Sequence, residues 1–167
     1  RRTGDHNRLG FALQLCALRY LGFAPDEVSG APSEAVAFVA RQLDVEPEAI
    51  TAYGGRAHTR IEQLRQVQTH LGFRKASSDD LRDLSDWLLE RALEHDRPAL
   101  LLELARQKLY DAKIVRPGVT TLEQMVGEIR RRAQKTTYTS VTLLLTPDRK
   151  ATLDRLLILD EDTRRTP

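Results

Sequence analysis

The chain has 167 residues, of which 41% are hydrophobic and 30% are charged, and its formal net charge is +2. This composition does not suit a disordered chain, and the apolar runs are too short to span a membrane. The single cysteine, Cys16, excludes an internal disulfide and zinc sites of the Cys₂His₂ or Cys₄ type. Because the chain begins Arg-Arg-Thr-Gly without an initiator methionine, we expect a piece of a longer cytoplasmic protein.

The charges are distributed unevenly along the chain. Residues 76–103 contain three basic and eight acidic side chains, whereas residues 104–135 contain eight basic and three acidic ones. The net charges of these two segments are therefore −5 and +5, while the flanking segments are close to balance. Two interpretations stay open, namely ordinary variation among solvated helix faces and a basic surface for a polyanion.

Hydrophobic periodicity predicts helices along nearly the whole chain. In chain order, the predicted helices span about residues 5–22, 32–43, 47–53, 57–71, 78–95, 98–111, 120–134 and 146–158. The signals for their ends include Asp5, Ser78 and a capping box from Thr120 to Glu123 at helix starts, and Gly22 and Gly72 at helix ends. The β-branched stretch 136–142 is compatible with one short extended excursion, with residues 138–141 as the candidate strand.

These elements predict an all-α fold of about eight helices in two small bundles. Residues 73–78 form the expected junction, so we expect one subdomain over residues 1–75 and another over residues 76–167. Each half contains two helices joined by a turn, at Asp44–Glu46 in the first half and around Pro117–Gly118 in the second. Both arrangements resemble a helix-turn-helix.

No arrangement of residues in the sequence favours catalysis, a metal or another cofactor. Cys16 falls on an apolar helix stripe, where a small buried hydrophobe is expected. The four histidines are not spaced as metal ligands, and the carboxylates between Asp79 and Asp86 are interpreted as a helix start followed by a solvated face. The alternative, a two-metal hydrolase that uses these carboxylates, is the least favoured hypothesis.

Nucleic-acid binding is the function that the residues favour most. In a helix-turn-helix the start of the second helix meets base edges, which predicts that role for Thr120, Thr121 and Gln124. The nearby basic side chains would contact phosphates, or interact with the dipole at the helix C-terminus. These basic residues are Lys113, Arg116, Arg130, Arg131, Arg132 and Lys135. A second candidate group follows Gly54-Gly55 and consists of Arg56, His58, Thr59 and Arg60, although solvated residues beside a helix cap explain it equally well.

Several stretches occur together and in order, and they suggest a family. They are Arg1-Arg2 with HNRLGFALQL at 6–15, VARQL at 39–43, Tyr53 with Arg56, Thr59 and Arg60, LGFR at 71–74, RPGVTTLE at 116–123 and residues 153–157. Together they resemble the N-terminal region of the Tn-three family of replicative transposases. The chain departs from the family pattern at Arg116, where the family has an apolar residue.

The resemblance implies a helical region that binds double-stranded DNA at the terminal inverted repeats of a transposon. It also implies that the other domains of the transposase are partners, and that no membrane is involved. The catalytic domain of that family is RNase H-like and lies far C-terminal, so we expect this chain to bind DNA without cutting it. The alternative is a helical protein-interaction or assembly module, in which the −5 and +5 segments pair with each other or with another chain.

Overall fold

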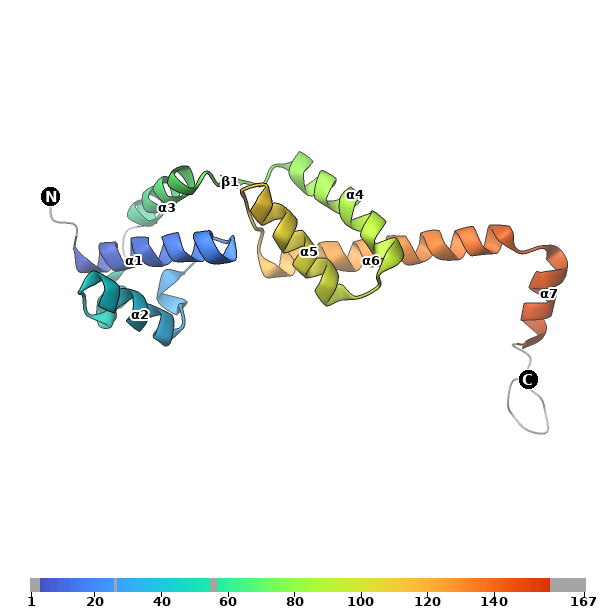
Figure 1. The fold of residues 1–167 in the computed structure, drawn as a ribbon, viewed down its shortest axis with the longest axis horizontal. Coiled ribbons are helices and arrows are strands. Elements are labelled where there is room, and N and C mark those ends of the chain that lie inside the picture. Colours follow the sequence, from blue (N-terminus) through green and yellow to red (C-terminus); the bar gives the residue numbers. More distant parts are fainter. Residues whose placement is uncertain (1–3, 26, 55–56, 157–167) are drawn as a thin grey trace, which may run out of the picture.

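The structure is a computed structural model that describes residues 4–25, 27–54 and 57–156, and it is helical almost throughout (Figure 1). The α-helices are α1 (Asp5–Cys16), α2 (Ser33–Leu43), α3 (Ala57–Leu71), α4 (Ser78–Glu94), α5 (Pro98–Asp111), α6 (Val119–Leu144) and α7 (Pro147–Leu156). The shorter elements are a π-helical turn η1 (Ala17–Leu21), two 3₁₀ helices η2 (Val28–Gly30) and η3 (Pro47–Ala52), and two short strands, β1 (Arg74–Lys75) and β2 (Ile114–Val115). The predicted all-α class is therefore confirmed.

The N-terminal half is built around α1. Its apolar stripe packs against α2, η3 and α3, and the cluster beneath it consists of Leu9, Leu13, Val28, Val36, Ala40, Ile50 and Tyr53. Gly10 permits a close contact with Tyr53, because a Cβ atom built on Gly10 would overlap the carbons of the Tyr53 ring. The Tyr53 hydroxyl donates a hydrogen bond of 2.9 Å to Gln63 Oε1, so this one side chain links η3 to both α1 and α3.

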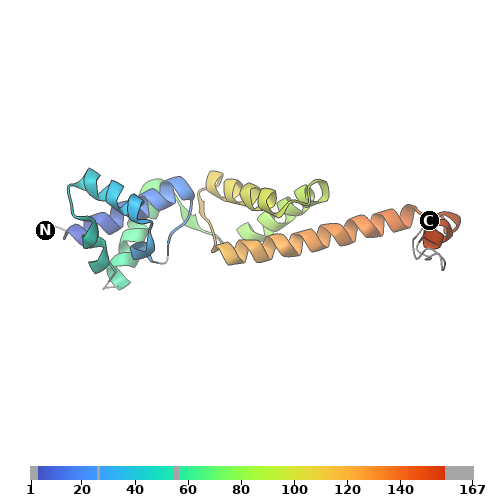
Figure 2. The same cartoon turned by 90° about the horizontal axis from the view of Figure 1, so that it is seen from below.

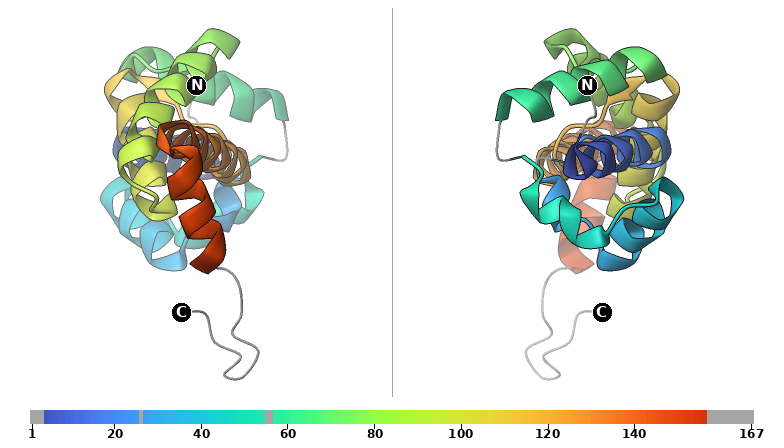
Figure 3. Two further views of the ribbon diagram at one scale, coloured as in Figure 1. Left: turned by 90° about the vertical axis from the view of Figure 1, so that its right-hand side faces the viewer. Right: turned by 90° about the vertical axis from the view of Figure 1, so that its left-hand side faces the viewer.

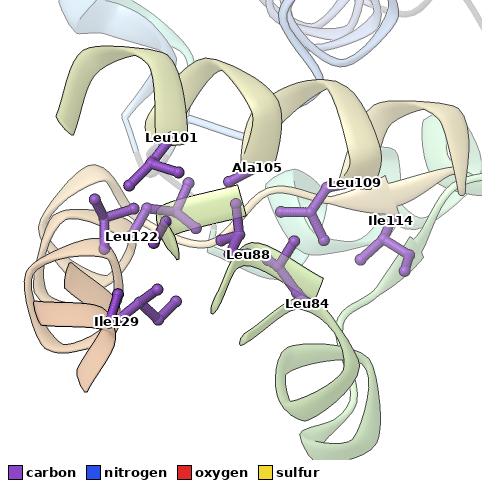
Figure 4. Packing of buried hydrophobic residues seen from close by; sticks show 11 residues of the cluster. Leu84, Leu88, Leu101, Ala105, Leu109, Ile114, Leu122 and Ile129 are labelled. Carbon is purple, nitrogen blue, oxygen red and sulfur yellow. The ribbon is translucent and has the colours of Figure 1, made fainter. Parts of the chain in front are cut away.

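The C-terminal half is a bundle of α4, α5 and the first half of α6. Side chains from all three helices point toward one another in its core (Figure 4). The buried members are Leu84, Leu88, Ala92, Leu101, Ala105, Leu109, Ile114, Leu122, Val126, Ile129 and Ala133. Burial along α6 stops at Ala133, although the helix continues to Leu144 and extends beyond the bundle toward α7 (Figure 2). In the end-on view, α7 runs across the axis of α6 (Figure 3).

The two halves meet at a junction made by backbone pairing. The strands β1 and β2 are parallel, with Arg74 opposite Ile114. The backbone N–H of Arg116 donates to the carbonyl of Gly22 at 2.9 Å, and the Tyr110 hydroxyl donates to the carbonyl of Arg19 at 2.6 Å. Leu18, Val67 and Phe73 are buried at this point, with Tyr110 packed against them.

The start of α4 is held by a capping box next to the junction. The Ser77 hydroxyl accepts a hydrogen bond from the backbone N–H of Asp80, and the Asp80 carboxylate accepts one from the backbone N–H of Ser77 at 2.8 Å. The Arg74 guanidinium donates to both oxygens of the same carboxylate. The bonds from Arg74, followed by those from Ser77, lower the pKa of Asp80 far below its usual range. This carboxylate therefore connects β1 to α4.

The predicted strand and several predicted helix starts are wrong. The β-branched stretch over residues 138–141 is helical and not extended, because it continues α6 without a break. The predicted cap at Thr120 is also wrong, since α6 begins one residue earlier with Gly118 as the N-cap and no capping side chain. Similarly, Ser77 and not Ser78 caps α4, and Gly4 and not Asp5 is the N-cap of α1.

The two predicted helix-turn-helix arrangements differ from each other in the structure. The connection between α2 and η3 is a tight turn over Asp44–Glu46, but the second element is a 3₁₀ helix. The connection between α5 and α6 spans residues 112–118 and contains β2, so it is longer than the three- or four-residue turn of the motif. The division of the chain at residue 75 stays a prediction. Within the described ranges, no helix is long and apolar enough to cross a membrane.

The contact between Gly10 and Tyr53 predicts a large cost for a single added methyl group. We expect Gly10→Ala to lower the free energy of unfolding by about 1–3 kcal/mol, because the ring must move out of a packed site. Urea unfolding followed by circular dichroism measures this change. Gly127→Ala is the matched control, since Gly127 also lies inside a helix and a Cβ atom there meets nothing within 4 Å. Equal stability of Gly10→Ala and the unmodified chain would contradict the close contact.

The Asp80 carboxylate predicts a pH-dependent contribution to stability. Its folded pKa is depressed, so the stabilisation is complete above the ordinary carboxyl pKa of about 4 and is lost as the pH falls through the folded pKa. We expect Asp80→Asn to unfold at lower urea concentration than the unmodified chain at pH 7, and the gap to shrink steadily below pH of about 4. Asp83→Asn, one turn along α4, is the control and should change little at either pH. A gap that stays constant down to pH 2 would refute the ionic origin.

Candidate nucleic-acid interface

The described members of the first candidate group lie in the first turn of α3. His58 is exposed, Thr59 and Arg60 are half-buried, and Arg56 lies outside the described residues. Tyr53, which precedes the group, is buried, and this burial raises the pKa of its hydroxyl while the charge of Arg60 opposes the shift. Tyr53 therefore supports the fold here, and the exposed surface of the group is that of His58.

The second candidate group begins at the junction with Lys113. This residue has a positive φ of 55°, and its carbonyl accepts a hydrogen bond from the backbone N–H of Arg74. Its ammonium group lies 4.9 Å from the ring centre of Phe73 and 5.1 Å from that of Tyr110. Lys113 is thus exposed but held over two aromatic rings, which places one positive charge at the junction.

Arg116 is the least satisfied basic side chain in this group. It is half-buried, its guanidinium lies 4.9 Å from the ring centre of Phe23, and its buried Nε atom has no hydrogen-bond partner within the described ranges. Burial lowers the pKa of Arg116, and the positive charge of Arg106 lowers it further. Arg106 itself is paired with Glu103. The guanidinium of Arg106 is therefore a second positive charge near Arg116.

Arg106 and Arg116 line the same hollow, which also reaches the first residue of α6. The hollow measures about 300 Å³, and Val119 and Leu122 form part of its wall. The 26-residue helix α6 begins here without a capping side chain and without an acidic residue in its first turn. The partial positive charge of a helix N-terminus is therefore not offset by a nearby carboxylate in that turn. The Glu103 carboxylate that is paired with Arg106 lines the hollow as well, so Arg116 and the helix N-terminus are the features that make this place suitable for an anion.

The predicted base-reading residues lie on the solvent side of the same helix start. Thr120, Thr121 and Gln124 are all exposed. They are separated from the basic run at Arg130 by six residues or more, and a helix rises about 1.5 Å per residue. The candidate residues are therefore spread along one helix, and they are not gathered in a single pocket.

The basic run in the middle of α6 divides into paired and unpaired side chains. Arg130 Nε donates to Asp96 Oδ1 at 2.7 Å, which lowers the pKa of that carboxyl, and Gln134 reaches the other oxygen. Arg131 is paired with Glu128 one turn earlier. Arg132 and Lys135 are exposed and have no ion pair within the part of the chain that the structure describes. Arg130 thus joins α6 to the loop between α4 and α5, and Arg132 and Lys135 are the available cations.

Arg106 was not among the predicted site residues, although it is the nearest charged neighbour of Arg116 that affects its pKa. The two residues are ten positions apart and are separated by a helix end and a strand. The +5 charge of residues 104–135 was the only signal in the sequence that pointed to this neighbourhood. Within the described ranges, no three His, Cys, Asp or Glu side chains lie close enough together to hold a metal ion.

Comparison with known proteins identifies the family. Residues 1–129 match the family model described as "Domain of unknown function (DUF4158)". The chain belongs to the DUF4158 family. The DUF4158 match covers α1 to α5 and the part of α6 that is packed in the bundle, apart from its last buried residue, Ala133.

Curated relatives of this DUF4158 chain are transposases. The transposase for transposon Tn501 of Pseudomonas aeruginosa is 35% identical over 158 residues, which are 95% of this chain and 16% of the relative. The transposase for transposon Tn1546 of Enterococcus faecium is 31% identical, over 94% of this chain and 16% of the relative. The transposase for transposon gamma-delta of Escherichia coli strain K12 is 32% identical, over 98% of this chain and 17% of the relative.

The chain therefore spans about a sixth of the length of the curated relatives it matches. The identification of its sequence with the N-terminal region of Tn-three family transposases is confirmed by these matches.

The division of the basic run predicts different effects for neighbouring arginines. We expect Arg130→Gln to lower the melting temperature, because Asp96 loses the guanidinium that bonds to it. Arg132→Gln is the matched control, with the same change of charge two residues away, and should leave the melting temperature unchanged. Differential scanning calorimetry at low salt measures both. Equal losses for the two variants would contradict the structural role of Arg130.

Proposed function

We propose that this chain is a DNA-binding region of a transposase and that it recognises the terminal inverted repeats of its transposon as double-stranded DNA. Membership of the DUF4158 family and the identity to transposases support this proposal. The observation that carries it is the start of α6. There the part-buried Arg116 guanidinium has no partner for its Nε among the described residues and lies beside a helix N-terminus without a capping side chain. A DNA phosphate would pair with the Arg116 guanidinium, since the Glu103 carboxylate in the same hollow is engaged by Arg106.

The remaining candidate residues take roles that follow from their exposure. Thr120, Thr121 and Gln124 are exposed next to the phosphate site and are assigned to base edges. Arg132 and Lys135 are assigned to phosphates farther along the duplex, whereas Arg130 and Arg131 are engaged in ion pairs. Lys113 adds a positive charge at the junction. The group at residues 56–60 is assigned to a second contact with the DNA backbone. Among the described candidate residues of this group, His58 is the exposed one.

The proposal assigns DNA recognition and not DNA cleavage to this chain. The relatives are named as transposases, but the matched region is 16–17% of their length. Strand cleavage is therefore assigned to the remaining part of the transposase. The carboxylates of α4 are accounted for in part by the capping box, since Asp80 is bound by Ser77 and Arg74.

A titration with two duplexes tests the proposal. One labelled duplex carries the terminal inverted repeat of the transposon that encodes the chain, and the other carries the same bases scrambled. Fluorescence anisotropy at two salt concentrations should give a preference of about a thousandfold or more for the repeat, with affinity falling steeply as salt rises. Equal and weak binding to both duplexes would overturn specific recognition and would favour the protein-interaction alternative.

Arg116→Gln tests the phosphate site within that titration. We expect similar losses of affinity on both duplexes and a decrease of about one in the slope of log K against log salt, because one phosphate contact is removed. The melting temperature should fall only slightly, since the Nε of the lost guanidinium has no partner within the described ranges and the contact with the Phe23 ring is weak. Arg82→Gln on α4 is the control with the same loss of charge, and unchanged binding by Arg116→Gln would remove this residue from the interface.

A further inference from the structure

The second half of α6 and the whole of α7 form a helical arm that the other described residues of the chain do not cover. We define the arm as residues 136–156. After Ala133 every residue of α6 is exposed, and α7 contains no buried residue (Figures 1 and 2). A helix normally gains its stability by packing an apolar face, so an arm of this length without tertiary contacts requires another surface.

The composition of the arm is unsuited to a helix surrounded by water. Residues 136–147 contain no charged side chain, so no ion pair between successive turns supports this part of α6. The stretch is rich in threonine and also holds Tyr138 and Val141, which are weak helix formers. Its sequence by itself favours an extended chain, yet the segment is helical. Neither its own sequence nor packing within the described residues accounts for its stability as a helix.

The arm also presents large apolar side chains to solvent. Tyr138, Val141 and Leu145 follow one another at spacings of three and four residues and so share one face of the helical path. Tyr138 is 71% exposed and Leu144, beside them, is 77% exposed. On α7, Leu153 and Leu156 are each 47% exposed, and Leu145 and Leu153 line one shallow hollow between the two helices. The face is continuous across the turn between α6 and α7.

Two further observations concern the segment that could cover this apolar face. The DUF4158 match ends at residue 129, within one turn of the last buried residue of α6, whereas the transposase relatives match on through most of the arm. The arm therefore lies outside the DUF4158 match and inside the transposase match. The relatives are about six times as long as the matched region, and a covalently attached partner acts at high effective concentration.

We infer that the arm is a docking surface for the polypeptide that follows this region in the full-length transposase. The occupant presents apolar side chains, because residues 136–147 offer no charge to pair with. The same lack of charge disfavours DNA as the occupant, since Lys and Arg side chains that neutralise phosphates supply much of the affinity for DNA. The inference rests on the match to longer transposases and does not depend on the DNA-binding proposal.

Hydrogen exchange in two proteins tests the inference. Exchange is measured by mass spectrometry in this chain alone and in the full-length transposase that contains it. We expect residues 136–156 to exchange at least about tenfold more slowly in the longer protein, because a covered helix opens less often. Peptides from α4 are the internal control and should exchange at similar rates in both proteins. Equally fast exchange of the arm in both proteins would overturn the inference.

A pair of variants separates docking from local helix stability. Val141→Lys places a charge on the apolar face, and Thr139→Lys places the same charge on the opposite side of the helix. Both residues are exposed, so neither variant should change the melting temperature of the chain alone. In the full-length transposase, only Val141→Lys should restore fast exchange in the arm. Equal effects of the two variants there would contradict a specific face.

Two other outcomes would assign the arm to a different occupant and overturn the inference. Analytical ultracentrifugation of the chain alone should show a monomer across the accessible concentrations. A dimer that Val141→Lys dissociates and Thr139→Lys does not would make a second copy the occupant. If the inverted-repeat duplex, added to this chain without the rest of the transposase, slowed hydrogen exchange in the arm, DNA would be the occupant.

Discussion

The parallel pairing of β1 with β2 determines where α6 begins. Each strand has only two residues, but the pairing brings Arg74 opposite Ile114 across a separation of 40 positions in the chain. The bond from the Arg116 backbone to Gly22 extends the same contact to the end of η1. The position of the Arg116 side chain against Phe23 follows from this backbone arrangement. The proposed phosphate site at the start of α6 therefore depends on contacts between the two halves of the chain.

The long helix α6 combines two different environments. Its first half is the third member of a helical bundle, with Leu122, Val126, Ile129 and Ala133 in the core. Its second half lies beyond the bundle and carries apolar side chains that are exposed. Arg130, bound to Asp96, lies near the boundary and joins the helix to the bundle at its last buried turns. A single helix thus connects the proposed DNA-binding surface to the docking arm.

The pairing of charges explains why the candidate site could be predicted only in outline. The excess of basic residues over 104–135 is plain in the sequence, and several of its exposed members remain candidates. The sequence could not show that Arg130 is held by Asp96, since the two residues come together only when α6 packs beside the loop after α4. It also could not show that Arg106 stands next to Arg116, because a strand that was not predicted separates them.

Local signals were sufficient for most helices, because periodic apolar residues, prolines and glycines act over one or two turns. Errors occurred where a distant contact decided the conformation, as at β1 and β2. They also occurred at residues 138–141, where the preceding turns of α6 continue as a helix although these residues have a weak preference for helix. The sequence by itself determined the all-α class, the approximate helix positions and the family resemblance. Only the tertiary structure decided which charges are neutralised and which apolar face is left uncovered, because both depend on which helices pack together.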